Sequence, residues 1–227
     1  MFTLDQVVPW GRSLDEYRAM FALTDADLES RRMLGCGDGP ASFNAEATRM
    51  NARVVSCDPI YRWTAADLRG RIDATYATVI EQTQKNAHEF VWDTITSVDE
   101  LGRVRMAAMD AFLADYPDGV RQGRYIDASL PELPFADHAF DVALCSHFLF
   151  LYSAQLGDEF HRLAVRELGR VATEVRIFPL LALGGAPSPF VDACLQVLRD
   201  DGFDVAIERV NYEFQRGGNQ MLRATRR

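Results

Sequence analysis

Lysine is almost absent from this chain of 227 residues: Lys85 is the only one, and the formal net charge is −9. A general nucleic-acid-binding protein needs a basic face that neutralises phosphates, and this composition does not supply one. No apolar run reaches the length that spans a bilayer, and the first residues lack a basic region followed by an apolar stretch. We therefore expect a cytoplasmic protein whose partners are neither nucleic acids nor membranes.

Cysteine is sparse, and its four positions stand far apart: Cys36, Cys57, Cys145 and Cys194. No CxxC pair occurs and no histidine lies at ligand spacing, so neither a metal site nor a disulfide framework is expected. Buried thiols in a reducing compartment fit this pattern better. The length and a hydrophobic content of 48% are sufficient for a core, and we expect residues 1–227 to form a single domain.

The first 58 residues alternate between helical and strand patterns. Residues 14–29 have helical apolar spacing, and Ser13 with Glu16 forms a capping box at their start. We expect residues 1–30 to form an N-terminal cap or lid segment. A short strand then leads into a glycine loop, a helix, and a second strand that ends at Asp58. This order is typical of the beginning of a parallel α/β sheet.

No strand pattern occurs between residues 63 and 118. Helical patterns occupy this range, and the last of them opens with a capping box at Ser97 and Glu100 and is expected to stop at Pro117 and Gly119. A crossover needs only one helix, so residues 63–118 are predicted to be a helical insertion after the second strand. Insertions on a scaffold usually carry specificity, which makes this one the expected source of substrate choice.

The strand–helix alternation returns after residue 118. Strands are predicted at 123–127, 139–146 and 172–181, and helices at 155–168 and 189–200. Two further strands, 204–214 and 220–226, are joined through RGGN, which indicates an antiparallel hairpin. The predicted fold is therefore α/β: a doubly wound, seven-stranded, mostly parallel sheet with a terminal antiparallel hairpin.

The glycine loop reads LGCGDGP, with the spacing GxGxG at Gly35, Gly37 and Gly39. A Walker loop ends in Gly-Lys-Ser/Thr, whereas this one ends in Gly-Pro-Ala. The dinucleotide fingerprint GxGxxG would place Pro40 at its third glycine, which is a poor match. An acidic residue, Asp58, follows Gly39 by 19 positions, at the end of the next strand.

This pattern resembles the class I S-adenosylmethionine-dependent methyltransferases. LGCGDG is similar to their first motif, and Asp58 in VVSCDP is similar to the acidic residue that ends their second strand. YIDASLPELPF is similar to their third motif and FDVALCSHFLF to the segment of their fourth strand. The resemblance covers about residues 31–227 and implies a Rossmann-like methyltransferase fold. One position departs from the family: Met33 stands where an acidic residue is usual, two positions before the first glycine.

The resemblance also implies which residues hold the cofactor, S-adenosylmethionine. Asp58 would accept hydrogen bonds from both ribose hydroxyls, which are charge-assisted bonds; the alternative is a solvated turn residue before Pro59. Asp127 would accept from the adenine amino group and the Ala128 amide would donate to the ring; the alternative for Asp127 is a turn or helix cap. The complete cofactor set is Arg12, Tyr17, Gly35, Cys36, Gly37, Gly39, Asp58, Pro59, Asp127, Ala128 and Ser146.

The N-terminal segment before the sheet is interpreted as a lid over the cofactor. Within it, Arg12 would pair with the methionine carboxylate, with Tyr17 nearby. The alternative is a packed Trp10 beside an exposed Arg12.

Methyl transfer from a sulfonium is an in-line displacement, so a protein mainly aligns the acceptor and excludes water. A general base is needed only if the acceptor must lose a proton, and His147 is the candidate. The alternative is a histidine packed at a strand end. The resemblance thus predicts a methyltransferase that acts on a small molecule. Two other functions stay open: an NAD-dependent oxidoreductase, and a non-catalytic protein that binds S-adenosylmethionine.

Overall fold

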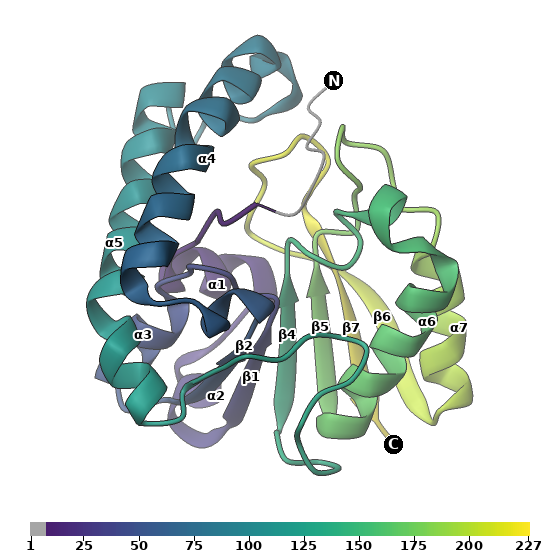
Figure 1. Cartoon of the computed structure of the whole chain (residues 1–227). Coiled ribbons are helices and arrows are strands. Elements are labelled where there is room, and N and C mark those ends of the chain that lie inside the picture. Colours follow the sequence, from purple (N-terminus) through teal and green to yellow (C-terminus); the bar gives the residue numbers. More distant parts are fainter. Residues whose placement is uncertain (1–7) are drawn as a thin grey trace.

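The computed structural model describes residues 8–227, and these form a seven-stranded sheet in the order β3-β2-β1-β4-β5-β7-β6 (Figure 1). The first five strands in this order are parallel: Tyr125–Ile126, Arg53–Cys57, Arg32–Cys36, Val142–Ser146 and Glu174–Phe178. Strand β7 (Gln220–Arg226) runs antiparallel to both β5 and β6 (Phe203–Arg209). The predicted fold class, with its terminal hairpin, is confirmed.

Helices cover both faces of the sheet. The inner strands are buried on both sides, so successive residues of β4 alternate between two apolar clusters. Val142 and Leu144 pack towards α1 (Leu14–Phe21) and α3 (Phe43–Arg49), which lie on the same face as α2 (Asp25–Ser30). Ala143 and Cys145 pack towards α6 (Ser153–Val171) and α7 (Val191–Asp200) on the other face.

The predicted single helix over residues 14–29 is wrong in one respect, because the structure contains two helices there. Ala22 ends α1 in the left-handed region at φ 49°, and a second capping box between Thr24 and Asp27 starts α2. The predicted box at Ser13 and Glu16 is confirmed. The first seven residues of the expected cap segment, 1–30, lie outside the described residues.

The expected helices of the insertion are α4 (Ala65–Lys85) and α5 (Val98–Arg121), which stand side by side along one edge of the molecule (Figure 1). Short 3-10 turns precede and follow α4, at Pro59–Arg62 and Ala87–Glu89. The predicted stop at Pro117 is wrong, because α5 continues to Arg121. Packing holds these last turns: the Tyr116 hydroxyl donates to the carbonyl oxygen of Tyr61, and its ring lies among other aromatic rings.

The connection between the last two strands is longer than the predicted RGGN turn. Strand β6 ends at Arg209, and residues 210–219, here named the β6–β7 loop, reach across to the segment between α4 and α5. The Val91 amide donates to the Phe214 carbonyl at 2.8 Å, and the rings of Phe90 and Phe214 stack at 4.9 Å. The connection is therefore a ten-residue loop that packs against the segment between α4 and α5, and not a tight hairpin turn.

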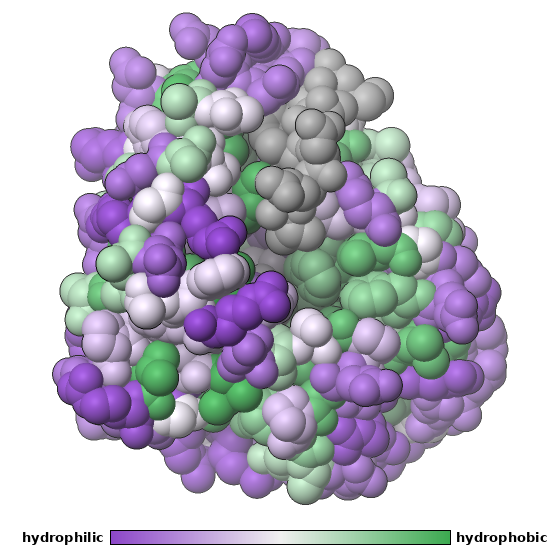
Figure 2. All heavy atoms as spheres, in the orientation of Figure 1, coloured by the Kyte–Doolittle hydropathy of each residue, from purple (hydrophilic) through white to green (hydrophobic). Residues whose placement is uncertain are grey.

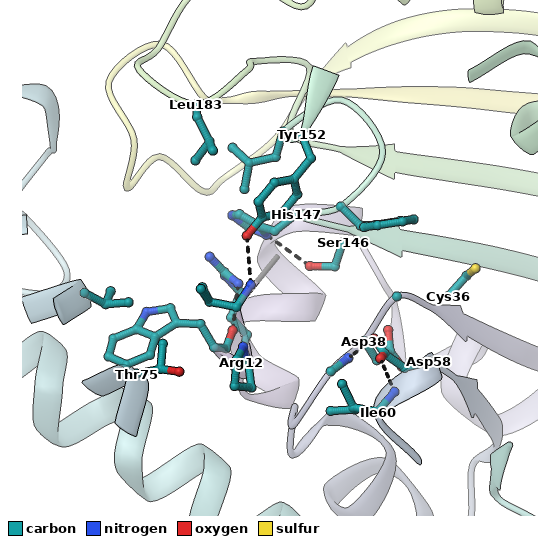
Figure 3. Close-up of a pocket in the computed structure, with 18 of the residues that line it drawn as sticks. Arg12, Cys36, Asp38, Asp58, Ile60, Thr75, Ser146, His147, Tyr152 and Leu183 are labelled. Atoms are coloured by element: carbon teal, nitrogen blue, oxygen red, sulfur yellow. Dashed lines mark hydrogen bonds between the residues drawn. The ribbon is translucent and has the colours of Figure 1, made fainter. Parts of the chain in front are cut away.

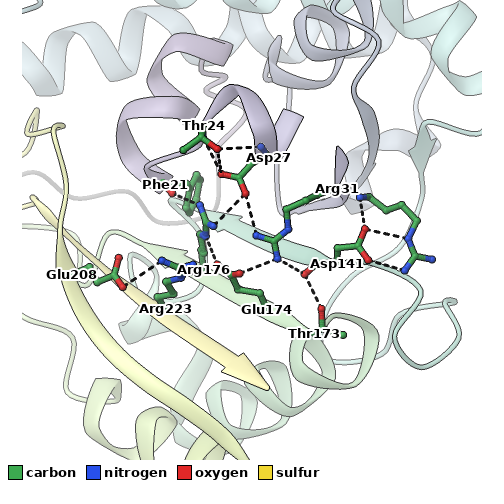
Figure 4. A network of polar contacts seen from close by, with 11 residues as sticks. Phe21, Thr24, Asp27, Arg31, Asp141, Thr173, Glu174, Arg176, Glu208 and Arg223 are labelled. Atoms are coloured by element: carbon green, nitrogen blue, oxygen red, sulfur yellow. Dashed lines mark hydrogen bonds and ion pairs between the residues drawn. The ribbon is translucent and has the colours of Figure 1, made fainter. Parts of the chain in front are cut away.

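A network of charged side chains lies around the amino ends of β1 and β5, and the antiparallel strand β7 contributes Arg223 to it (Figure 4). Glu174 is 4% exposed and accepts hydrogen bonds from Arg31, Arg176 and Arg223. Arg176 also donates to the carbonyl oxygen of Phe21 at the end of α1. The network therefore fixes α1 and α2 against the sheet. None of the helices in residues 8–227 is long and apolar enough to cross a membrane.

Candidate active site

A cavity of about 530 Å³ lies beyond the carboxyl ends of β1, β2 and β4 (Figure 3). Its other walls come from α4, the β6–β7 loop and the residues that precede α1. The space-filling view shows the hollow in the centre of this face, with hydrophobic residues gathered beside it (Figure 2). Strands β2 and β3 extend the sheet to one side of β1 and β4 extends it to the other. Open α/β sheets bind ligands at such a reversal of strand order.

The glycine loop forms the floor of the cavity. Gly37 and Gly39 have φ values of 70° and 56°, a region that side chains disfavour. Gly35 is needed for another reason: a Cβ there would lie 1.8 Å from Oδ2 of Asp38, whose carboxylate folds back onto β1. A Cβ on Gly39 would meet no atom within 4 Å, so the space above this glycine is open.

Asp38 is an acidic residue of the site that the sequence interpretation passed over. Its Oδ1 accepts a hydrogen bond from the Tyr17 hydroxyl at 2.7 Å, and its Oδ2 accepts one from Ser56 at 2.6 Å. Burial, with a contribution from the charge of Asp58, raises the pKa of Asp38 to about 7. Met33 is buried among side chains of α1 and α3 instead. The glycine loop thus carries a carboxylate at Asp38, whereas Met33, at the position where class I methyltransferases usually have an acidic residue, is apolar.

Tyr17 of α1 contacts the glycine loop through its hydrogen bond to Asp38. Its ring stacks on Phe43 with centroids 4.2 Å apart, and only 1% of the residue is exposed. Helix α1 begins at the Ser13 capping box and so places Tyr17 in its first turn. Tyr17 lines the cavity through its contact with Asp38, and its ring is part of the core.

Asp58, the residue that follows β2, is hydrogen-bonded to the glycine loop. Its Oδ2 accepts from the Gly39 amide and its Oδ1 from the Ile60 amide, both at 2.9 Å (Figure 3). Burial and the nearby charge of Asp127 raise the pKa of Asp58 to about 6, against the effect of these two amides. A carboxylate oxygen has two lone pairs, so each oxygen can still accept from a ligand hydroxyl.

Only part of the segment YIDASLPELPF, which is similar to the third methyltransferase motif, lines the cavity. Ala128 contributes to its wall together with Ser129 and Leu130. Asp127 is exposed and is not part of the wall, although it lies close enough to Asp58 to affect the pKa of that residue. Its contact with an adenine amino group stays a prediction.

Ser146 and His147 follow β4 and both line the cavity. The Ser146 hydroxyl lies 3.0 Å from Nδ1 of His147 (Figure 3). His147 has φ 50°, and its amide donates to the Phe178 carbonyl at 2.7 Å. Left-handed backbone in a residue other than glycine is uncommon and concentrates at functional sites. Burial, and then the positive charges of Arg12 and Arg105, hold the pKa of His147 well below its usual range, so the ring is neutral near pH 7.

Residues 8–13 cross the glycine loop. A Cβ on Gly11 would lie 2.0 Å from the Pro40 carbonyl oxygen, and the Ser42 amide donates to the Arg12 carbonyl at 3.0 Å. The Arg12 side chain enters the cavity wall, where its Nη1 donates to the Trp10 carbonyl at 3.1 Å. Its Nε is buried without a hydrogen-bond partner among the described residues. Burial and the charge of Arg105 lower the pKa of Arg12.

Arg105 already has partners. It is fully buried on α5, and its Nη1 lies 2.5 Å from Oε2 of Glu16. The Tyr212 hydroxyl donates to the other Glu16 oxygen at 2.9 Å. Burial acts to raise the pKa of Glu16, but the charge and hydrogen bond of Arg105, the charge of Arg12 and the Ser13 amide together lower it to about 2. Of these two arginines, Arg12 is therefore the one that lacks a carboxylate partner within residues 8–227.

Most of the predicted cofactor residues come together around this cavity, with Gly35 beneath the loop and Asp127 outside it. The sequence interpretation missed several wall residues: Asp38, Tyr152, Leu183, Phe214 and Gln215. Asp38 had a recognisable signal, since it is the carboxylate inside the glycine loop. Phe214 and Gln215 had none, because their position depends on how far the β6–β7 loop reaches.

The strand order and the glycine loop that joins β1 to α3 define the class I methyltransferase fold. A magnesium protoporphyrin IX methyltransferase from Synechocystis PCC 6803, solved with bound SAM, is 14% identical with a TM-score of 0.47; the match covers 89% of this chain and 73% of that one. A SAM-dependent methyltransferase from Methanosarcina mazei is 12% identical with a TM-score of 0.43 and coverages of 87% and 93%. Since both scores are under 0.5, the fold is assigned from the topology alone.

No family model matches the sequence. The uncharacterized protein MJ0045 of Methanocaldococcus jannaschii is 33% identical over 222 residues, which is 96% of each chain. The chain belongs to the same family as this archaeal protein.

Proposed function

We propose that this protein binds S-adenosylmethionine in the cavity and transfers its methyl group to a small molecule. The observation that carries the proposal is the placement of Asp58 and Arg12 around one glycine loop. Asp58 is hydrogen-bonded to the Gly39 amide, and Arg12 is a cation whose buried Nε has no partner within the described chain. The cofactor has a ribose diol, which suits the carboxylate of Asp58, and an amino acid carboxylate, which suits the guanidinium of Arg12.

The residues present fit the cofactor by their chemistry. Asp58 would accept hydrogen bonds from the ribose hydroxyls, Arg12 would donate to the carboxylate, and the Ala128 amide would donate to the adenine. The open space above Gly39 allows a ligand to approach the backbone closely. When bound, the cofactor supplies an electrophilic methyl group on a sulfonium.

The remaining walls of the cavity suit a small acceptor with an apolar ring. The rings of Phe90 and Phe214 stack on each other, and Val79, Leu101 and Leu183 contribute aliphatic surface. These side chains come from the helical insertion, the β6–β7 loop and the loop after β5. Such a wall excludes water and holds the acceptor in line, which is what a displacement requires.

An NAD-dependent oxidoreductase fits these residues less well. Asp58 is compatible with the ribose of either cofactor, but a pyrophosphate at the glycine loop would lie close to the buried carboxylate of Asp38, and the loop lacks the third glycine of the dinucleotide fingerprint. A protein that binds the cofactor without turnover fits the same cofactor contacts, and only an assay of product formation separates it from an enzyme.

The experiment is a calorimetric titration with S-adenosylhomocysteine, with NAD and ATP as controls, followed by an assay for S-adenosylhomocysteine release with a panel of small aromatic acceptors. Binding of S-adenosylhomocysteine alone, with turnover of at least one acceptor, supports the proposal. Binding of NAD without binding of S-adenosylhomocysteine contradicts it.

A further inference from the structure

Tyr152 contributes a buried hydroxyl to the wall of the cavity. The residue immediately precedes α6, lines the cavity and is only 3% exposed. Its hydroxyl oxygen accepts a hydrogen bond from the Val8 amide at 3.4 Å (Figure 3). Because a backbone amide can only donate, the Tyr152 hydroxyl keeps its own hydrogen for another partner. No atom within residues 8–227 accepts that hydrogen.

The unused hydrogen sets Tyr152 apart from the other buried tyrosines. Five tyrosines are buried in the described part of the chain, and four of them donate their hydroxyl hydrogen to an oxygen of the protein: Tyr17, Tyr61, Tyr116 and Tyr125. A buried polar hydrogen without an acceptor costs free energy, and phenylalanine would fill the same space without that cost. Packing alone therefore does not account for a tyrosine at position 152.

Two hydrogen bonds connect the segment that carries Tyr152 to the apolar part of the cavity. The Leu183 amide donates to the Leu151 carbonyl at 2.9 Å, and Nε2 of Gln215 donates to the Ala182 carbonyl at 3.2 Å. Tyr152 is thus held against the loop after β5, which in turn is held against the β6–β7 loop. These two loops supply part of the wall that suits an apolar ring.

The proposed cofactor contacts lie elsewhere in the cavity. Figure 3 shows Tyr152 beside Leu183 and away from Asp38 and Asp58, which belong to the glycine loop and the end of β2. The hydroxyl is therefore placed for the second ligand of the cavity. Burial raises the pKa of Tyr152, so its hydrogen is present at neutral pH.

We propose that Tyr152 recognises the methyl acceptor by donating this hydrogen to an oxygen of the acceptor. The inference rests on the proposed function and narrows the acceptor class to ring compounds that carry a carbonyl or another hydrogen-bond-accepting oxygen. A ring without such an oxygen would cover the hydroxyl and leave its hydrogen unpaired, and this penalty makes the contact selective. Tyr152 thus determines which acceptor binds and takes no part in holding the cofactor.

The test compares 1-indanone with indane, two probes that share a bicyclic ring and differ by one carbonyl oxygen. Each is titrated by ligand-observed NMR, with and without S-adenosylhomocysteine. Tyr152→Phe should lower the affinity for 1-indanone by about 5-fold and leave the affinity for indane unchanged, since one neutral hydrogen bond is lost. The affinity for S-adenosylhomocysteine, measured by calorimetry, should be the same in wild type and Tyr152→Phe.

Tyr116→Phe is the matched control, because the Tyr116 hydroxyl already donates to the Tyr61 carbonyl at 2.6 Å and lies outside the cavity wall. This control should leave the affinity for both probes unchanged and lower the melting temperature by about 2–4 °C. Tyr152→Phe should keep the wild-type melting temperature, because its hydroxyl hydrogen has no protein partner to lose. Val8 is only half-buried, so its amide can turn to water instead.

The inference is overturned if Tyr152→Phe unfolds or melts as low as the control, since the hydroxyl would then be structural. An equal loss of affinity for both probes, a loss of affinity for S-adenosylhomocysteine, or a wild type that binds neither probe also overturns it. Failure of the proposed function is a separate result. In that case S-adenosylhomocysteine does not bind, and the probe titrations without it still report on Tyr152.

Discussion

Tyr17 and Asp38 are 21 positions apart in the sequence, and their side chains meet at 2.7 Å beneath the glycine loop. The contact joins α1, which precedes the sheet, to the loop that follows its first strand. Removing the hydroxyl in Tyr17→Phe leaves a buried carboxylate oxygen without its donor. We expect a loss of about 1–3 kcal/mol in the free energy of unfolding, measured by urea titration above pH 7. Tyr17→Phe should cost much less in an Asp38→Asn background; equal costs in both backgrounds would contradict the coupling.

The raised pKa of Asp38 makes the stability of the ligand-free protein depend on pH. Between its ordinary value of 3.8 and its folded value of about 7, the folded state binds more protons than the unfolded state. The contribution of Asp38 to the free energy of unfolding is therefore full below about pH 4 and is lost as the pH rises to about 7. His147 acts in the opposite sense, because its pKa is lowered on folding. We therefore compare wild type with Asp38→Asn at each pH: the wild-type advantage should decline across this range, and a constant difference would contradict the prediction.

Arg12 should recognise the amino acid part of the cofactor and no other part. Arg12→Gln is expected to lower the affinity for S-adenosylhomocysteine by 10-fold or more, since a hydrogen bond to a charged group contributes about 1.5–3 kcal/mol. The matched ligand is 5′-methylthioadenosine, which has the same nucleoside but no carboxylate. Its affinity should be unchanged in Arg12→Gln when both ligands are measured by calorimetry. An equal loss for both ligands would assign Arg12 to the shape of the cavity instead.

The buried network around Glu174 should matter for stability and not for ligand binding. Glu174→Gln removes the charge that three arginines share, and breaking a buried ion pair from one side costs about 3–5 kcal/mol. The control is Glu81→Gln, because its exposed pair with Lys85 should contribute less than about 1 kcal/mol. Thermal and urea unfolding measure both variants. A cost for Glu174→Gln as small as that of the control would show that the network contributes little to folding.

Much of the fold was predictable from the sequence because its signals are local. The glycine loop, the acidic end of β2 and the regular alternation of strands and helices determine the sheet without knowledge of tertiary contacts. The break between α1 and α2 was missed because the Thr24–Asp27 capping box lies inside a continuous apolar periodicity. Pro117 was taken as a stop, but aromatic packing around Tyr116 holds the helix beyond it.

The candidate site was predictable only where one segment supplies both the signal and the contact. Asp58 and the glycines are recognised by spacing along the chain, and they do come together. The partners of Asp38 come from α1 and β2, so no local pattern reveals that its carboxylate folds back beneath the loop. The same holds for Phe214, which reaches the cavity through a loop that is longer than its turn sequence indicates.

The most direct test of the account is the affinity of S-adenosylhomocysteine for wild type, Asp58→Asn and Asp58→Ala, measured by calorimetric titration. The titrations are made at about pH 8, above the Asp58 pKa of about 6, so that the wild-type carboxylate is ionised. Losing two charged hydrogen bonds to the ribose should weaken binding by well over 10-fold in Asp58→Ala, with Asp58→Asn in between. The contact with the Gly39 amide is also lost in Asp58→Ala, so the melting temperature without ligand is recorded as a control for folding. Unchanged affinity in a folded Asp58→Ala protein would contradict the ribose contact and the proposed cofactor site.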